Sequence, residues 1–231
     1  MDIRLLEPEL LDALPATALE AIQSRRDLRR LNAWMRHARV LAGELNRFAA
    51  RQPLRRIVEL GAGDGTLSLK IARQLSPAIR GVEILLVDRQ PVVEESILAQ
   101  FRELEWTAVP VVADVFTWLE RDEKCDGMFA NLFLHHFESA DLPEILRPAS
   151  RHTRVFLACE PRRSPLPLLI SRMLWVIGCN SVTRHDAFRS VRAGFARREL
   201  SELWPDRVNW RVRENALGLF SHFFAAERAP S

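Results

Sequence analysis

A glycine-rich turn between an apolar strand and a helix constrains this 231-residue chain more than any other feature. From Ile57 to Thr66 the chain reads IVELGAGDGT. Glycines let a backbone turn tightly and let a ligand approach closely, and the helix that follows offers unpaired N–H groups near its start. The segment therefore predicts a strand, a ligand-binding turn and a helix, in that order.

Strands and helices alternate after this turn. The hydrophobic pattern predicts strands at 56–60, 83–87, 108–113, 127–133 and 154–159, and helices at 66–75, 92–104, 116–121 and 139–146. Alternation of this length predicts an α/β fold whose parallel sheet is covered on both faces by right-handed crossovers. Residues 207–214 and 218–228 then predict an antiparallel hairpin that closes the sheet.

The segments on either side of this pattern predict a helical cap. Helical spacing of apolar residues indicates a mostly helical N-terminal prelude, and we expect residues 1–52 to form a separate cap. Residues 53–231 would form the main domain. Within it, an insert at about 162–204 predicts an apolar helix at 164–178 and a polar helix at 184–203, which together would cover a substrate.

Composition narrows the class of protein. The 33 basic and 30 acidic residues give a net charge of only +3, and the basic residues form short clusters, which argues against a nucleic-acid partner. Three cysteines without a CxxC pattern argue against a disulfide framework or a zinc site and favour a reducing, cytoplasmic location. The N-terminus lacks a signal-peptide pattern. The longest apolar stretch, about 12 residues, is too short for a transmembrane segment of about 20.

Three carboxylates lie at or just after the carboxyl ends of predicted strands. Glu59 precedes a GxGxG turn, and a carboxylate there suits a cationic ligand better than the diphosphate that the GxGxxG pattern binds. Asp88 would accept hydrogen bonds from two ribose hydroxyls, as in NAD enzymes, so it does not alone choose the cofactor. Asp114 would accept from an adenine amino group while Val115 packs on the ring, or Asp114 would cap the next helix.

The segments VELGAGDGTLSLKIA, LLVD, VVADVF, NLFLHHF and the stretch from Ile145 to Pro161 resemble, in order, the motifs of class I S-adenosylmethionine-dependent methyltransferases. The resemblance covers about residues 56–161. It implies a Rossmann-like, doubly wound, mostly parallel sheet of seven strands whose last strand is inserted antiparallel, and S-adenosyl-L-methionine as the cofactor. The expected cofactor-binding residues are Glu59, Gly61, Ala62, Gly63, Asp64, Asp88, Arg89, Asp114, Val115 and Asn131.

One local departure concerns the turn after the fourth helix. Many relatives have Pro-Gly-Gly there, whereas this chain has Arg147-Pro148-Ala149-Ser150. The difference leaves the predicted fold intact and affects only the local turn.

The fourth predicted strand leads into Asn131-Leu132-Phe133-Leu134-His135-His136-Phe137. The Asn-Pro-Pro of enzymes that methylate bases or glutamine is absent, and the sequence is more similar to small-molecule methyltransferases of quinone and polyketide pathways. Histidine is a suitable base for an acceptor hydroxyl, and the candidates are His136 first, then His135 and His185. The two adjacent histidines could instead pack or cap a helix. We expect no metal in the reaction, because no carboxylates cluster near this segment in the sequence.

The helical insert supplies the candidate acceptor-binding residues. Met173 and Trp175 lie in its apolar part and would contact the acceptor, or would belong to an ordinary buried helix. Arg192 would bind an acidic group, although a solvated helix face explains that charge equally well. In the prelude, a helix with Asn32, Trp34 and His37 would close over the cofactor.

These features predict a methyltransferase that acts on a small hydroxylated, aromatic or polyketide-like acceptor. Methyl transfer to carbon or nitrogen is an alternative, and a catalytically silent cofactor-binding subunit is another of a different class. An NAD-dependent oxidoreductase fits less well, because the chain has no tyrosine for a proton relay. The sequence does not determine the oligomeric state.

Overall fold

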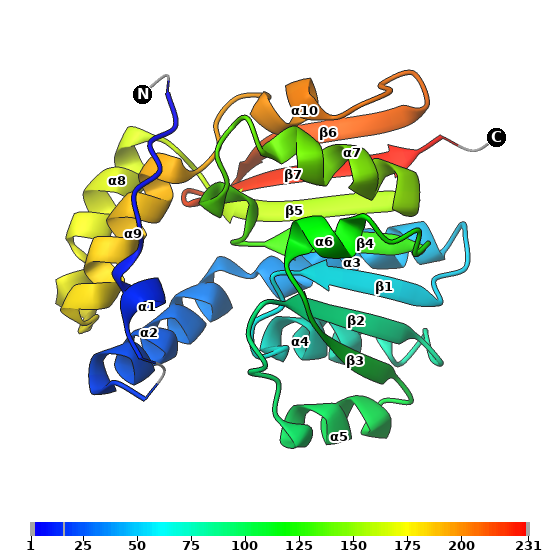
Figure 1. Cartoon of the computed structure of the whole chain (residues 1–231), viewed down its shortest axis with the longest axis horizontal. Helices are drawn as coiled ribbons and strands as arrows, with labels where there is room; N and C mark the ends of the chain where they lie inside the picture. The colour runs from blue at the N-terminus through cyan, green and yellow to red at the C-terminus, as the bar shows by residue number, and fades with distance from the viewer. Residues whose placement is uncertain (1–2, 16, 230–231) are drawn as a thin grey trace.

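The computed structural model describes residues 3–15 and 17–229, and a seven-stranded sheet runs through its centre (Figure 1). The strands are β1 (Arg56–Leu60), β2 (Glu83–Asp88), β3 (Thr107–Val112), β4 (Gly127–Asn131), β5 (Val155–Pro161), β6 (Trp210–Leu217) and β7 (Ser221–Arg228). Their order is β3-β2-β1-β4-β5-β7-β6, and β7 runs antiparallel to both of its neighbours. The predicted α/β sheet with its inserted antiparallel strand is confirmed.

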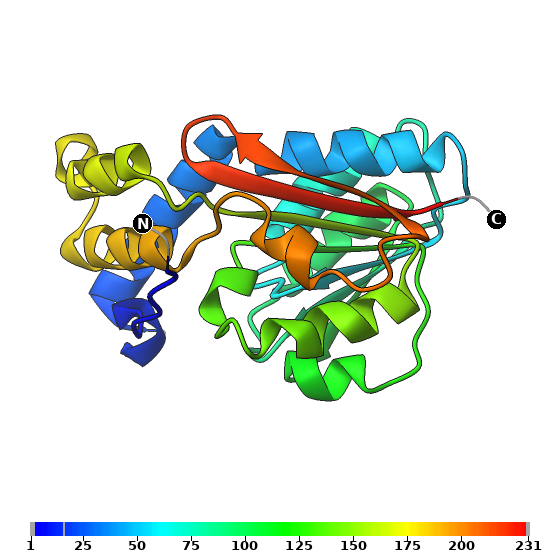
Figure 2. The ribbon, with the colours of Figure 1, turned by 90° about the horizontal axis from the view of Figure 1, so that it is seen from above.

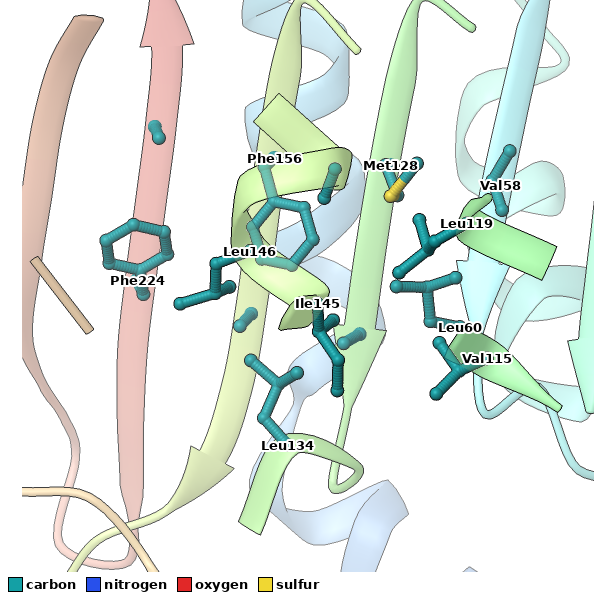
Figure 3. Close-up of a cluster of buried hydrophobic side chains, with 14 of the residues drawn as sticks. Val58, Leu60, Val115, Leu119, Met128, Leu134, Ile145, Leu146, Phe156 and Phe224 are labelled. Carbon is teal, nitrogen blue, oxygen red and sulfur yellow. The ribbon is translucent and has the colours of Figure 1, made fainter. Parts of the chain in front are cut away.

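Helices cover both faces of the sheet (Figure 2). On one face lie α3 (His37–Ala49), α4 (Thr66–Leu75) and α5 (Glu95–Glu103). On the other lie α6 (Val115–Leu119), α7 (Leu142–His152) and α10 (Glu199–Leu203). Because alternate residues of a strand point to opposite faces, each face has its own core. Figure 3 shows one of them, in which Phe156 of β5 and Phe224 of β7 lie beside Leu146 of α7.

A second group of helices gathers at the carboxyl ends of the parallel strands (Figure 1). It consists of α1 (Leu10–Ala13), α2 (Leu19–Met35), α8 (Pro165–Arg172) and α9 (Ser181–Ala193), and α9 contacts the other three. Two 3₁₀ turns belong to this end, η1 (Leu134–His136) and η2 (Leu174–Ile177). The prelude is therefore divided, because α3 packs on the sheet whereas α1 and α2 pack on the insert. No helix within the described ranges is long and apolar enough to cross a membrane.

Several predicted helix boundaries differ from the structure. The apolar helix predicted at 164–178 ends at Arg172 and is followed by η2, and the helix predicted at 139–146 instead runs from Leu142 to His152 through Pro148. The polar helix predicted at 184–203 is two helices that a turn at Gly194 separates. A Cβ atom at Gly194 would overlap the carbonyl oxygen of Pro161, so this close backbone approach requires glycine.

Candidate active site

The glycine turn forms a tight backbone loop at the carboxyl ends of β1 and β2. Gly61, Gly63 and Gly65 have φ angles of 70°, 53° and 74°, which glycine adopts without strain. The N–H groups of Gly61 and Ala62 donate to the carbonyl oxygen of Val87 at 2.9 and 3.0 Å. This loop is therefore fastened to the end of the neighbouring strand.

Asp88 ties the same loop from the side. Its Oδ2 accepts the N–H of Gly63 at 2.8 Å, and its Oδ1 accepts the N–H of Gln90 at 2.9 Å. The carboxylate is half-buried, and the neighbouring Arg89 is exposed. Asp88 thus lies partly exposed beside the loop, and two backbone N–H groups donate to its carboxylate.

Glu59 lies beneath the turn and is fully buried. Burial raises the pKa of its carboxyl group to about 8, against a hydrogen bond from the Ser68 hydroxyl that opposes the shift. Asp64, whose Oδ1 accepts the N–H of Thr66 at 3.0 Å, and Asp88 both raise it further. At neutral pH the Glu59 carboxyl therefore carries a proton.

Asp114 and Val115 follow β3. The Asp114 side chain is exposed and accepts the N–H of Phe116 at 2.9 Å, so it caps α6. Val115, the first residue of α6, is buried in the hydrophobic core. The helix-capping role is thus present, and the adenine contact of this pair stays a prediction.

Asn131, the last residue of β4, is bonded to the prelude. Its Oδ1 lies 2.7 Å from Nδ1 of His37, and Nε2 of His37 lies 2.6 Å from the Ser221 hydroxyl at the start of β7. Burial lowers the pKa of His37, so its ring is neutral. This chain of bonds joins α3, β4 and β7 beside the glycine turn. The side chains of Asn32 and Trp34 lie outside the described residues.

His135 lies between two carboxylates that the sequence analysis did not identify. Its Nδ1 is 2.8 Å from Glu160 Oε2, and its Nε2 is 3.8 Å from Glu9 Oε1. Burial alone would lower the pKa of His135, but the hydrogen bond to Glu160 and the interactions with both carboxylates outweigh it and raise the pKa to about 9. Burial alone would raise the pKa of Glu9, but the nearby histidine rings, chiefly His135, and a hydrogen bond from Ser190 lower it to about 2. His135 is thus a cation whose ring nitrogens already face partners.

The N-terminal strap, residues 4–11, binds the remaining predicted polar residues of the insert. The Asp186 carboxylate accepts the N–H groups of Leu10 and Leu11 at 2.8 and 2.9 Å, and His185 Nδ1 lies 3.0 Å from the same carboxylate. Arg192 pairs with Glu7 of the strap at 2.7 Å. Asp186 and Arg192 hold the strap against α9, whereas His185 contacts Asp186 and not the strap.

The apolar part of the insert exposes its side chains. Met173 is 50 % exposed and Trp175 is 62 % exposed, and Leu169 on the preceding helix is 57 % exposed. An ordinary core helix would bury such residues. Of the two alternatives for this segment, the exposure favours a contact surface.

The sequence itself matches a family described as methyltransferase domain, over residues 31–223. The chain belongs to this methyltransferase family. No curated protein matches it in sequence. The family, the sheet order and the glycine turn together identify an S-adenosyl-L-methionine-dependent methyltransferase.

Solved structures with the same fold are distant in sequence. The plantazolicin methyltransferase BpumL in complex with SAH has a TM-score of 0.66 and 12 % identity, and the match covers 92 % of each chain. The magnesium protoporphyrin IX methyltransferase ChlM from Synechocystis, with bound SAH, has a TM-score of 0.55 and 10 % identity, covering 95 % of this chain and 91 % of that one. The methyltransferase SibL, in its apo form, has a TM-score of 0.64 and 16 % identity, covering 95 % and 61 %.

The residues at the turn fit the cofactor of this methyltransferase. Nothing in the described structure lies within 4 Å of where a Cβ of Gly63 would be, so a ligand can approach the backbone there, and the partly exposed Asp88 carboxylate beside it can accept hydrogen bonds from ribose hydroxyls. Glu160 and Glu9 were missed for different reasons. Glu160 follows the rule of an acid near the end of a strand, whereas Glu9 reaches the site only through tertiary packing.

We predict that Asp88→Ala weakens the binding of S-adenosylmethionine and of its demethylated product by about tenfold to a hundredfold, because charge-assisted hydrogen bonds contribute about 1.5–3 kcal/mol. Calorimetry measures both affinities. Asp122→Ala, which removes a carboxylate that is 81 % exposed, is the matched control and should bind as the wild type does. Unchanged affinity in Asp88→Ala, or binding of NAD instead, would contradict the assignment.

The buried carboxyl of Glu59 predicts a pH-dependent stability. Its pKa is about 8 in the folded chain and about 4.5 when unfolded, so between these values the folded state holds the extra proton. The stabilisation is therefore complete below about pH 4.5 and is lost as the pH rises towards about 8, by at most about 1.4 kcal/mol per pH unit. Glu59→Gln should lack this loss. Denaturant unfolding across this range measures it, and parallel curves for the two proteins would refute it.

Proposed function

We propose that this methyltransferase transfers the methyl group to a hydroxyl of a small aromatic or polyketide-like molecule. The observation that carries the proposal is the end of β4, where His136 lies exposed on η1, which contacts α9 of the insert. An acceptor lying there would have His136 beside its reacting hydroxyl.

S-adenosylmethionine, when bound, supplies a methyl group activated by a positively charged sulfur. The protein must align the acceptor oxygen with that carbon, exclude water and receive the proton. Held at the glycine turn and Asp88, the cofactor would supply its methyl group to the acceptor oxygen and leave as its demethylated product. The acceptor's proton goes to a ring nitrogen of His136, and His136 is the proposed catalytic base.

The other two histidine candidates are less suited to the role. His135 is buried and protonated between Glu160 and Glu9, so it has no free lone pair at neutral pH. His185 is bonded to Asp186, which holds the strap. Loss of His135 would also leave Glu160 without its ring partner. His136 therefore remains the first choice.

We place the acceptor against the apolar side of the insert, at Met173 and Trp175. An aromatic or acyl group of the acceptor would cover their exposed carbon surface. Each Å² of apolar surface removed from water would contribute about 25 cal/mol to the free energy of binding. Arg192 is bound to Glu7, so it would meet an acidic group of the acceptor only by leaving the strap.

Transfer to carbon or nitrogen, and a silent cofactor-binding subunit, remain the competing functions. Incubation with labelled S-adenosylmethionine and a panel of phenols, quinones and fatty-acyl aromatics separates them. Mass spectrometry then locates the methyl group on oxygen, carbon or nitrogen. Cofactor binding without transfer to any acceptor would support the silent subunit.

We predict that His136→Ala lowers turnover by about 10²- to 10⁴-fold, which is the usual contribution of a general base, and leaves cofactor affinity unchanged. The effect should shrink at high pH with a phenolic acceptor, since the phenol then ionises without help. Turnover on the best acceptor of the panel measures both.

His185→Ala is the comparison for this experiment. This variant removes the histidine of α9 that contacts Asp186. We expect its turnover to stay near that of the wild type. If both variants keep normal turnover at neutral pH, catalysis uses no histidine base and rests on alignment alone.

We further predict that Trp175→Ala changes the ranking of acceptors while cofactor affinity stays within about twofold, because surface substitutions cost little stability. Relative kcat/KM values across the panel measure the change. Val208→Ala removes another exposed apolar side chain, 92 % exposed and outside the insert, and should leave the ranking unchanged. An equal loss of acceptor and cofactor binding in Trp175→Ala would indicate a structural role instead.

A further inference from the structure

Three potential metal ligands come together where the N-terminal strap meets η1. One ligand atom each from Glu9, His135 and His136 lies within 4.8 Å of the others. Glu9 belongs to the strap, whereas the two histidines follow β4. The fold, and not the local sequence, brings these residues together.

The orientation of His135 is that of a metal-binding histidine. Its Nδ1 lies 2.8 Å from the buried carboxylate of Glu160, so an Nδ1–H donor would leave Nε2 directed at Glu9. Histidines that bind metals almost always donate their other N–H in this way, which fixes the tautomer and the ring. Glu160 is itself fixed, because it accepts the N–H groups of Phe133 and Leu134 at 3.1 and 2.9 Å.

The separations suit a shared ion better than a direct hydrogen bond. His135 Nε2 and Glu9 Oε1 are 3.8 Å apart, beyond the usual N–H···O range of about 2.7–3.2 Å. Two ligands on one tetrahedral zinc ion, each at about 2.0–2.2 Å, lie about 3.4 Å apart. Glu9 precedes α1 and is not part of a regular element, so a small movement of the strap closes the difference.

Charge also favours an ion. The rings of His135 and His136 have centroids 4.2 Å apart, so the two side chains lie side by side. The carboxylates of Glu9 and Glu160 lie on either side of His135, and their two negative charges would balance the two positive charges of a divalent ion. Two imidazoles and one carboxylate are a common donor set for zinc, and a water molecule would complete the tetrahedron.

We propose that Glu9, His135 and His136 form a binding site for a divalent metal ion of the zinc type, which fastens the N-terminal strap to the end of β4. The ion replaces the proton on Nε2 of His135, so that proton is released to solvent on binding. Glu160 orients His135 without touching the ion.

Methyl transfer does not require the proposed metal ion. Zinc bound to His136 would occupy the nitrogen that the proposed base uses, so zinc should inhibit transfer. The expected inhibition rests on the proposed function, whereas zinc binding itself does not. The two can therefore fail independently.

The test is a titration of chelator-treated full chain with zinc chloride by calorimetry, and with cobalt(II), whose visible spectrum reports tetrahedral ligands. The wild type should bind one ion and show the tetrahedral spectrum. Glu9→Gln and His136→Asn should each weaken binding at least about tenfold, as loss of a single ligand or of its support does. Both residues are at least partly exposed, so these variants should fold.

His185→Ala is the matched control, because it removes a histidine near the strap that is not among the three ligands. It should bind zinc as the wild type does. The proposal would be overturned if the wild type failed to bind zinc at micromolar concentration. It would also be overturned if Glu9→Gln and His136→Asn bound zinc as tightly as the wild type does. Circular dichroism of each variant separates a lost ligand from a lost fold, and the conservative Glu9→Asp should recover part of the affinity.

Discussion

The carboxylate of Glu160 organises the end of β4. It is fully buried, and a buried carboxylate is stable only when donors surround it. Here three consecutive backbone N–H groups, from Phe133 to His135, and the ring of His135 supply them. These bonds hold η1 against β5 and so decide where His136 lies. The acceptor side of the site thus depends on one charge in the neighbouring strand.

The cofactor side is organised differently, by backbone geometry. Three glycines turn the chain after β1, and the loop is fastened to the carbonyl oxygen of Val87 and to the Asp88 carboxylate. The ring of Phe133, the residue just before η1, occupies the space that a Cβ of Gly61 would need. The two halves of the site therefore meet where η1 touches the glycine turn.

The features that could be predicted from the sequence are those with a local cause. The glycine turn, the alternation of strands and helices and the position of Asp88 follow from short patterns, and the sheet order follows from the resemblance that those patterns carry. The zinc-type cluster could not be found by counting cysteines, because its ligands are histidines and a distant glutamate. Arg192 was interpreted as a substrate contact and His185 as a candidate base, because a sequence does not show that Arg192 pairs with Glu7 and His185 with Asp186; both roles stay predictions. Helix ends were misplaced where tertiary contacts decide them, as at Gly194.

The antiparallel insertion of β7 has a consequence for synthesis on the ribosome. β5 gains its second neighbour only when residues 221–228 have left the exit tunnel, since β7 lies between β5 and β6. Until then one edge of a strand buried along its whole length is unpaired, and such edges associate with other chains. The nascent protein would therefore depend on chaperones late in translation, and slow codons just before the last strand would lengthen the vulnerable interval.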